Sequence, residues 1–104
     1  MKTVLKSKVR QIAVTDANID YEGSLTLDQD IMDLMGVEPY EQVYVHSKQG
    51  KGRIMTYLIA GERGSKCCML NGGAANHFEV GEIVHILAFS TVPQMRKTLK
   101  PRIV

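Results

Sequence analysis

Apolar and polar residues alternate along much of this chain with a period of two, which is typical of β-strands. The pattern predicts a strand from Val4 to Val14 and a short one at Leu25–Leu27. Residues 42–61 are expected to form two strands around a glycine-containing turn. Further strands are expected at 67–70 and at 81–92. Many short strands with one or two short helices predict a mainly β protein, a small β-barrel.

The period changes once, in the stretch "DQDIMDLMGVEP" of residues 28–39. Asp28 is a good N-cap, Gly36 favours a left-handed stop, and Pro39 follows shortly afterwards. We therefore expect a short helix whose apolar face consists of Ile31, Met32, Leu34 and Met35. "NGGAAN" (71–76) is expected to be an irregular loop. Residues 93–104, with two prolines and several charges, are expected to be a loosely attached tail.

The length of 104 residues allows one domain, residues 1–104, with a single core. A hydrophobic fraction of 44% and a charged fraction of 23% are those of a soluble globular protein. No apolar run is long enough to span a bilayer, and the charged N-terminus does not resemble a signal peptide. These features predict a cytoplasmic protein with no membrane association. The adjacent Cys67 and Cys68 are interpreted as small strand residues, one facing inward and one outward.

Basic residues concentrate at the two ends of the chain: four lie in residues 1–14 and four in 95–104, out of 13. Such ends can bind nucleic acid, but they are more often solvated, and the chain has no Trp and only two Phe. We expect no nucleic-acid partner, and keep a nonenzymatic β-barrel binding module with basic termini as the alternative function. The three histidines, His46, His77 and His85, lack metal-ligand spacing, so no metal is expected.

The pair Gly23–Ser24 stands directly before the predicted strand at Leu25. A hairpin corner is the ordinary interpretation. The alternative is self-cleavage, because a serine hydroxyl can attack the preceding carbonyl and convert the amide into an ester. Gly23 tolerates the unusual backbone geometry that this attack requires. Hydrolysis of the ester would merely nick the chain, whereas β-elimination and loss of ammonia would leave a pyruvoyl group at position 24.

Four motifs occur together in a fixed order: "YEGS" followed by "LDQD", then "GKGRIMTYLIAGERGS", "NGGAA" and "VGEIV". Over residues 1–92 the chain resembles the bacterial pyruvoyl-dependent aspartate 1-decarboxylases. The resemblance implies a double-psi β-barrel and a homotetramer with active sites between subunits. It implies self-cleavage into residues 1–23 and 24–104, with a maturation factor as a further partner in some members. The implied reaction converts L-aspartate to β-alanine and CO2 for pantothenate and coenzyme A biosynthesis.

The resemblance also implies roles for individual residues. Ser24 would become the pyruvoyl group, which forms a Schiff base with the substrate, and Tyr57 would be the proton donor. Arg53, on the same strand face as Tyr57 by parity, would bind the side-chain carboxylate of aspartate. Position alone would make Tyr57 a half-buried strand aromatic and Arg53 a surface residue. The remaining substrate-binding candidates that the resemblance implies are Lys8, Thr56, Asn71, Gly72, Gly73 and Ala74.

The chain departs from the family pattern at several positions. Arg10 stands where many members have His, and His46 where many have Trp. Gly73 replaces a common Ala, and Asn76 a common His. The first two departures concern the shape of the pocket and leave open how strictly aspartate is selected. No firm role is carried over for Tyr21 and Glu22, which precede the cleavage point.

Overall fold

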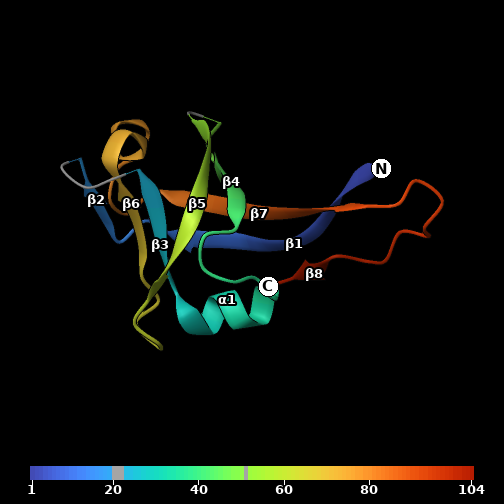
Figure 1. Ribbon diagram of the computed structural model, residues 1–104. Helices are drawn as coiled ribbons and strands as arrows, with labels where there is room; N and C mark the ends of the chain where they lie inside the picture. Colours follow the sequence, from blue (N-terminus) through green and yellow to red (C-terminus); the bar gives the residue numbers. More distant parts are fainter. Residues whose placement is uncertain (20–22, 51) are drawn as a thin grey trace.

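The structure is a computed structural model that describes residues 1–19, 23–50 and 52–104. Its described part consists mainly of strands, with a short α-helix and a 3-10 helix (Figure 1). The expected strands and helix are all present. The short strands Asp16–Asn18 and Arg102–Ile103 are additions, because segments of two or three residues are too short to show a period. In chain order the elements are β1 (Lys2–Ala13), β2 (Asp16–Asn18), β3 (Ser24–Asp28), α1 (Gln29–Met35), β4 (Gln42–Ser47), β5 (Arg53–Gly61), β6 (Cys68–Asn71), the 3-10 helix η1 (Gly72–His77), β7 (Ile83–Val92) and β8 (Arg102–Ile103).

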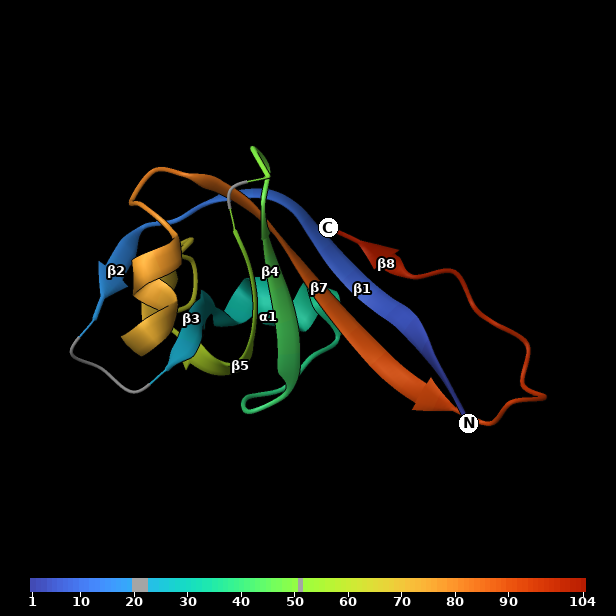
Figure 2. The same ribbon diagram turned by 90° about the horizontal axis from the view of Figure 1, so that it is seen from above.

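The strands form one hydrogen-bonded sheet in the order β2-β6-β3-β5-β4-β7-β1-β8. The two longest strands, β1 and β7, pair antiparallel with two register shifts, and both views show them side by side along most of their length (Figures 1 and 2). β3 and β5 pair in parallel although α1 and β4 separate them in the sequence. This crossover places the beginning of β3, which carries Ser24, in the strand next to the one that carries Arg53 and Tyr57.

The helix α1 begins and ends where the sequence predicts. Asp28 is the N-cap, and its carboxylate accepts a hydrogen bond from a first-turn backbone N–H at 2.8 Å. Gly36 ends the helix in the left-handed conformation at φ 75°. Met32 and Met35 are fully buried, but Leu34 is 61% exposed, so its predicted place on the apolar face is wrong. Seven residues cover only a narrow stripe of the core, and Leu34 lies outside that stripe.

The carboxylate of Asp28 also connects the helix to the β5–β6 turn. It accepts hydrogen bonds from the backbone N–H groups of Gly64 at 3.1 Å and Lys66 at 2.7 Å. Arg63 of the same turn forms ion pairs with two carboxylates of α1. Burial alone would raise the pKa of Asp28, but the backbone hydrogen bonds and the nearby Arg63 lower it overall. The carboxylate is thus a structural link between α1 and the end of the barrel strands.

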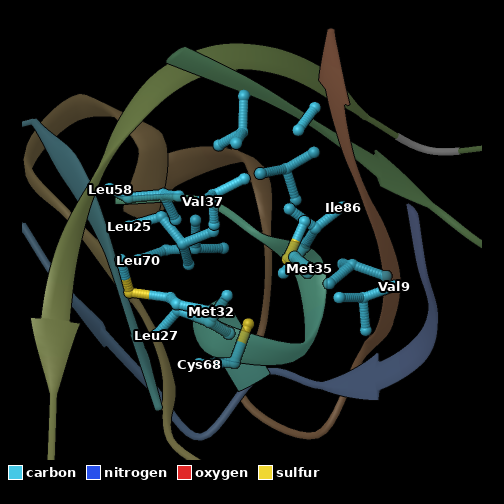
Figure 3. Packing of buried hydrophobic residues seen from close by; sticks show 14 of the residues in the cluster. Val9, Leu25, Leu27, Met32, Met35, Val37, Leu58, Cys68, Leu70 and Ile86 are labelled. Atoms are coloured by element: carbon cyan, nitrogen blue, oxygen red, sulfur yellow. The ribbon is translucent and has the colours of Figure 1, made fainter. Parts of the chain in front are cut away.

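The hydrophobic core lies between α1 and the inner faces of the strands (Figure 3). Met32 and Met35 of the helix point toward leucines of β3, β5 and β6 and toward Val9 and Ile86 of the β1–β7 pair. Cys68 is buried and Cys67 is partly exposed, as expected, and both are free thiols. Burial raises the pKa of the Cys68 thiol to about 12. It therefore behaves as a small apolar side chain.

Two expectations are corrected by the structure. Residues 72–77 form the 3-10 helix η1 and not an irregular loop. Gly72, at φ 66°, lets the chain turn directly after β6, and packing of Ala74 and Phe78 on the core fixes the segment that follows. The tail is attached at its end, because β8 pairs in parallel with β1. The backbone N–H of Val104 donates to the Lys8 carbonyl at 2.8 Å. The open edge of β1 provides the unpaired groups for this contact.

Candidate active site

Ser24 lies in a buried hydrogen-bonded group with Asn71 and Thr26. Ser24 opens β3 and pairs with Asn71, the last residue of β6. Ser24 is fully buried and Asn71 is 3% exposed. The Asn71 Nδ2 donates hydrogen bonds of 3.0 Å to both Ser24 Oγ and Thr26 Oγ1. Because Ser24 and Thr26 are two residues apart on one strand, they share a face, and one amide holds both hydroxyls.

Gly23, directly before the buried serine, is exposed. A Cβ added to it would meet no atom within 4 Å among its described surroundings. The backbone therefore passes from an exposed residue to a fully buried one across the single peptide bond Gly23–Ser24. Tyr21 and Glu22 lie outside the described residues.

The segment Gly72–Ala74 follows Asn71 without interruption and forms the first turn of η1. Gly72 is buried, Gly73 is exposed, and Ala74 is partly buried against the core. Since Ser24 pairs with Asn71, this turn starts next to the serine. The structure thus brings together Ser24, Asn71 and the start of the glycine-rich segment.

Arg53 and Tyr57 lie on the outward face of β5. Arg53 pairs with His46, and Tyr57 pairs with Gln42, four residues apart on β4. Arg53 and Gln42 line a cavity of about 620 Å³ on this face. Gln42 also lines a shallower cavity of about 540 Å³ with Tyr57 and Tyr40, whose rings stack at a centroid distance of 6.3 Å. The two cavities therefore adjoin at Gln42.

Thr56 differs from its two neighbours. It pairs with Val43, which is fully buried, so its side chain belongs to the inward face of β5. The opposite parity of Thr56 and Tyr57 that the sequence indicates is thus present in the structure.

Lys8 of β1 contributes to a cluster of positive and titratable groups on the same outer face as Arg53. The pKa of His46 is lowered by burial first, and then by Arg53, His85 and Lys8. The pKa of His85 is lowered by burial and by Lys8, Lys48 and Arg10. The electrostatic environment of this face therefore favours neutral imidazoles and attracts anions.

The predicted residues thus form two groups. One is the buried group around Ser24 and Asn71, and the other is the outward face with Arg53, Tyr57 and Lys8. The cavity that Arg53 lines does not include Ser24. Sequence reasoning missed Thr26 and Tyr40. The two-residue spacing from Ser24 was a signal for Thr26, whereas nothing in the sequence indicated that Tyr40 would stack on Tyr57.

In residues 1–19, 23–50 and 52–104, no group of three or more His, Cys, Asp or Glu side chains could hold a metal ion. The helices in these same segments are too short or too polar for any of them to cross a membrane.

The fold and the site define a small β-barrel protein with a glycine–serine junction at the start of a buried strand. The chain is similar in fold to the computationally designed msDPBB_sym2 protein, a double-psi β-barrel, with a TM-score of 0.52, 13% identity, and coverage of 84% of this chain and 99% of that chain. The predicted double-psi β-barrel is confirmed.

The family model described as aspartate decarboxylase matches residues 1–104, and the chain belongs to this family. It is 42% identical to an aspartate 1-decarboxylase of Phocaeicola vulgatus, over 100% of this chain and 90% of the relative. It is 48% identical to an aspartate 1-decarboxylase of Leptospira biflexa, over 88% of this chain and 78% of the relative. Family membership confirms the resemblance and does not favour the alternative of a nonenzymatic binding module.

Proposed function

We propose that this protein is a self-processing, pyruvoyl-dependent aspartate 1-decarboxylase that converts L-aspartate to β-alanine and CO2. Membership of the aspartate decarboxylase family supports the reaction. The observation that carries the proposal is the buried Ser24 hydroxyl, which accepts a hydrogen bond from Asn71 directly after an open glycine. The reaction would supply pantothenate and coenzyme A biosynthesis in the cytoplasm.

The residues around Ser24 fit a pyruvoyl group formed from it. Self-cleavage would separate residues 1–23 from 24–104. Gly23 tolerates the unusual backbone geometry that an attack of the Ser24 Oγ on its carbonyl requires. The amide of Asn71 fixes the position of that oxygen at 3.0 Å. When present, the pyruvoyl group would supply a ketone and an electron-withdrawing carbonyl, which no amino-acid side chain provides.

The chain's other residues would bind the substrate and move a proton. Arg53 would bind the side-chain carboxylate of aspartate, because its planar guanidinium matches a carboxylate with two parallel hydrogen bonds. Lys8 would add positive charge on the same face. Tyr57 would donate a proton to the carbon that loses CO2, since a phenol is neutral at pH 7 and can still release its proton.

The remaining candidates would act near the proposed cleavage point. Backbone N–H groups of Gly72, Gly73 and Ala74 would complement Asn71 in binding a carboxylate. Thr56 would act from the inward, core-facing side of β5.

Assembly into a homotetramer would complete the site. The Arg53 cavity opens on the outer sheet face, whereas Ser24 is buried at the start of β3. A second subunit that covers the outer face would bring its own Ser24 toward this cavity, so we propose active sites between subunits. Apolar residues on that face, Tyr44, Met55 and Phe89, are exposed in the single chain and suit such a contact.

Denaturing mass spectrometry of the purified protein tests the proposal. Two fragments are expected, and the larger one should be lighter than the sequence 24–104 by the mass of ammonia. Ser24→Ala should remain intact and release no β-alanine. A larger fragment with an ordinary serine at its N-terminus would reject pyruvoyl formation and would indicate a chain that is only nicked. A single intact mass, even after incubation with a cell extract that could supply a maturation factor, would reject self-processing.

A further inference from the structure

His46 occupies the centre of a cross-strand row on the outer sheet face. It pairs with Arg53 of β5 on one side and with His85 of β7 on the other. Residues that stand directly opposite each other in antiparallel strands project from the same face. The flanking residues Val45 and Ser47 are buried, so the row points outward, away from the core.

The Nε2 atom of His46 is buried and has no hydrogen-bond partner in residues 1–19, 23–50 and 52–104. A polar atom that has lost its hydration without gaining a partner costs free energy, and such atoms are rare in native proteins. His46 also lines the 620 Å³ cavity beside Arg53. A ligand oxygen in this cavity would provide the missing partner.

The groups around His46 are positive or neutral. Arg53 faces it from β5, His85 from β7 and Lys8 from β1, and each lowers the pKa of His46 in addition to the effect of burial. The Tyr44 ring on its own strand contacts it edge-on at a centroid distance of 6.3 Å. Glu41 lines the cavity too, but its carboxylate forms an ion pair of 3.1 Å with Lys6, whose positive charge balances its negative charge. No ion pair to Arg53 occurs within the described part of the chain.

An anion that enters the cavity beside Arg53 would change the protonation of His46. Without a ligand, burial first and then the surrounding charges lower the pKa of His46 and favour its neutral imidazole. A carboxylate bound to Arg53 would cancel part of that positive charge and would place an acceptor near the imidazole, and both effects favour the protonated ring.

His85 is less suited to this role, because its Nδ1 already accepts a hydrogen bond from the backbone N–H of Gln11 at 3.3 Å. Protonation at Nδ1 would break this bond.

We propose that His46 is a second binding residue for a ligand carboxylate beside Arg53, and that it takes up one proton when a dicarboxylate occupies the cavity. The imidazole then donates from Nε2 to one carboxylate oxygen, and the proton comes from the solvent. The choice of a dicarboxylate of four carbons rests on the proposed function. The cavity geometry and the unpartnered nitrogen do not depend on it.

Isothermal titration calorimetry with succinate tests this inference without any turnover, because succinate has no amine that could react with a carbonyl. Titrations at pH 7 in two buffers of different ionisation enthalpy give the number of protons taken up on binding. We expect a clear uptake in the wild-type protein that approaches one proton as the pH rises. Over the same range the affinity should fall up to tenfold per pH unit.

His46→Gln should remove the proton uptake and weaken succinate about tenfold or more, as expected for the loss of a charge-assisted hydrogen bond. His85→Gln is the matched control and should retain the uptake. With L-aspartate as substrate, His46→Gln should raise KM and remove its dependence on pH, with a much smaller effect on kcat.

Several results would overturn the inference: wild-type binding without proton uptake, no succinate binding at all, or equal losses in the two histidine variants. The wild-type buffer comparison keeps the inference testable even if His46→Gln folds poorly. Failure of the proposed function is a separate result, because a chain that stays intact and releases no CO2 can still bind succinate with uptake of a proton.

Discussion

Replacement of Asn71 by alanine tests the contact that holds Ser24 at the proposed cleavage point. The Asn71 amide donates two hydrogen bonds of 3.0 Å, a buried one to Ser24 Oγ and a partly buried one to Thr26 Oγ1. A hydrogen bond of this kind contributes about 0.5–1.5 kcal/mol net. If this bond holds the Ser24 Oγ in the rotamer that attacks the Gly23 carbonyl, its loss makes that rotamer less favourable by about the same free energy and should slow self-cleavage roughly 2- to 10-fold. Thr26→Val keeps the shape of the site and the bond to Ser24, so it should cleave at the wild-type rate.

Two measurements separate the effect on cleavage from the effect on stability. The cleavage rate is followed by denaturing mass spectrometry in the natural serine background. Stability is measured by urea unfolding in the Ser24→Ala background, where no cleavage occurs.

In that background, Asn71→Ala and Thr26→Val remove the same remaining hydrogen bond. Each should cost about 0.5–1.5 kcal/mol, and the combination should cost less than the sum of the two. Wild-type cleavage in Asn71→Ala, or strict additivity of the two stability losses, would refute the reasoning.

Three further predictions concern packing, pH and catalysis. Gly61→Ala should destabilise the fold by about 1–3 kcal/mol in urea unfolding, because its Cβ would clash with Cys67 Sγ and would lie only 3.1 Å from the backbone carbonyl oxygen of Leu27 in the paired strand β3. Gly73→Ala is the control: its Cβ would meet nothing within 4 Å, so the stability should change by less than about 0.5 kcal/mol. The lowered pKa of Asp28 stabilises the fold above its ordinary value of 3.8, and this contribution is lost as the pH falls through the folded-state pKa. The free energy of unfolding of Asp28→Asn should therefore depend less steeply on pH in that range than that of the wild-type protein. An unchanged pH dependence would show that Asp28 does not contribute to acid unfolding. Tyr57→Phe should still cleave itself but release little β-alanine by chromatography, and full activity would exclude Tyr57 as the proton donor.

The features predicted best from the sequence are those set by local chemistry. The α1 boundaries follow from Asp28 and Gly36, whose cap geometries depend on a few neighbouring residues. Leu34 was misplaced because the apolar stripe of so short a helix depends on which strands it contacts. The 3-10 helix was missed because two glycines disfavour a helix, and only burial of Ala74 and Phe78 in the folded protein compensates for this.

In the candidate site, too, features set by neighbouring residues were predictable and those set by tertiary contacts were not. Parity along β5 correctly placed Arg53 and Tyr57 on one face, since alternation is a property of a single strand. The partnership of Ser24 with Asn71 joins residues 47 positions apart through the β3–β6 register, which no local pattern encodes. The stacking of Tyr40 on Tyr57 likewise depends on the path of the chain between α1 and β4.

The strand β5 connects the two groups of candidate residues. It pairs in parallel with β3, where Leu25 stands opposite Leu58, and antiparallel with β4, where His46 stands opposite Arg53. Both Leu25 and Leu58 are fully buried, so the β3–β5 contact is fixed by close packing in the core. A strand with one face packed in the core and Arg53 of its other face in the cavity can hold the proposed substrate-binding groups at a constant distance from the serine junction. Because Ser24 does not line the Arg53 cavity, the proposed function requires a partner subunit to bring a second Ser24 to it, and close packing between β3 and β5 makes this simpler than a movement within the chain.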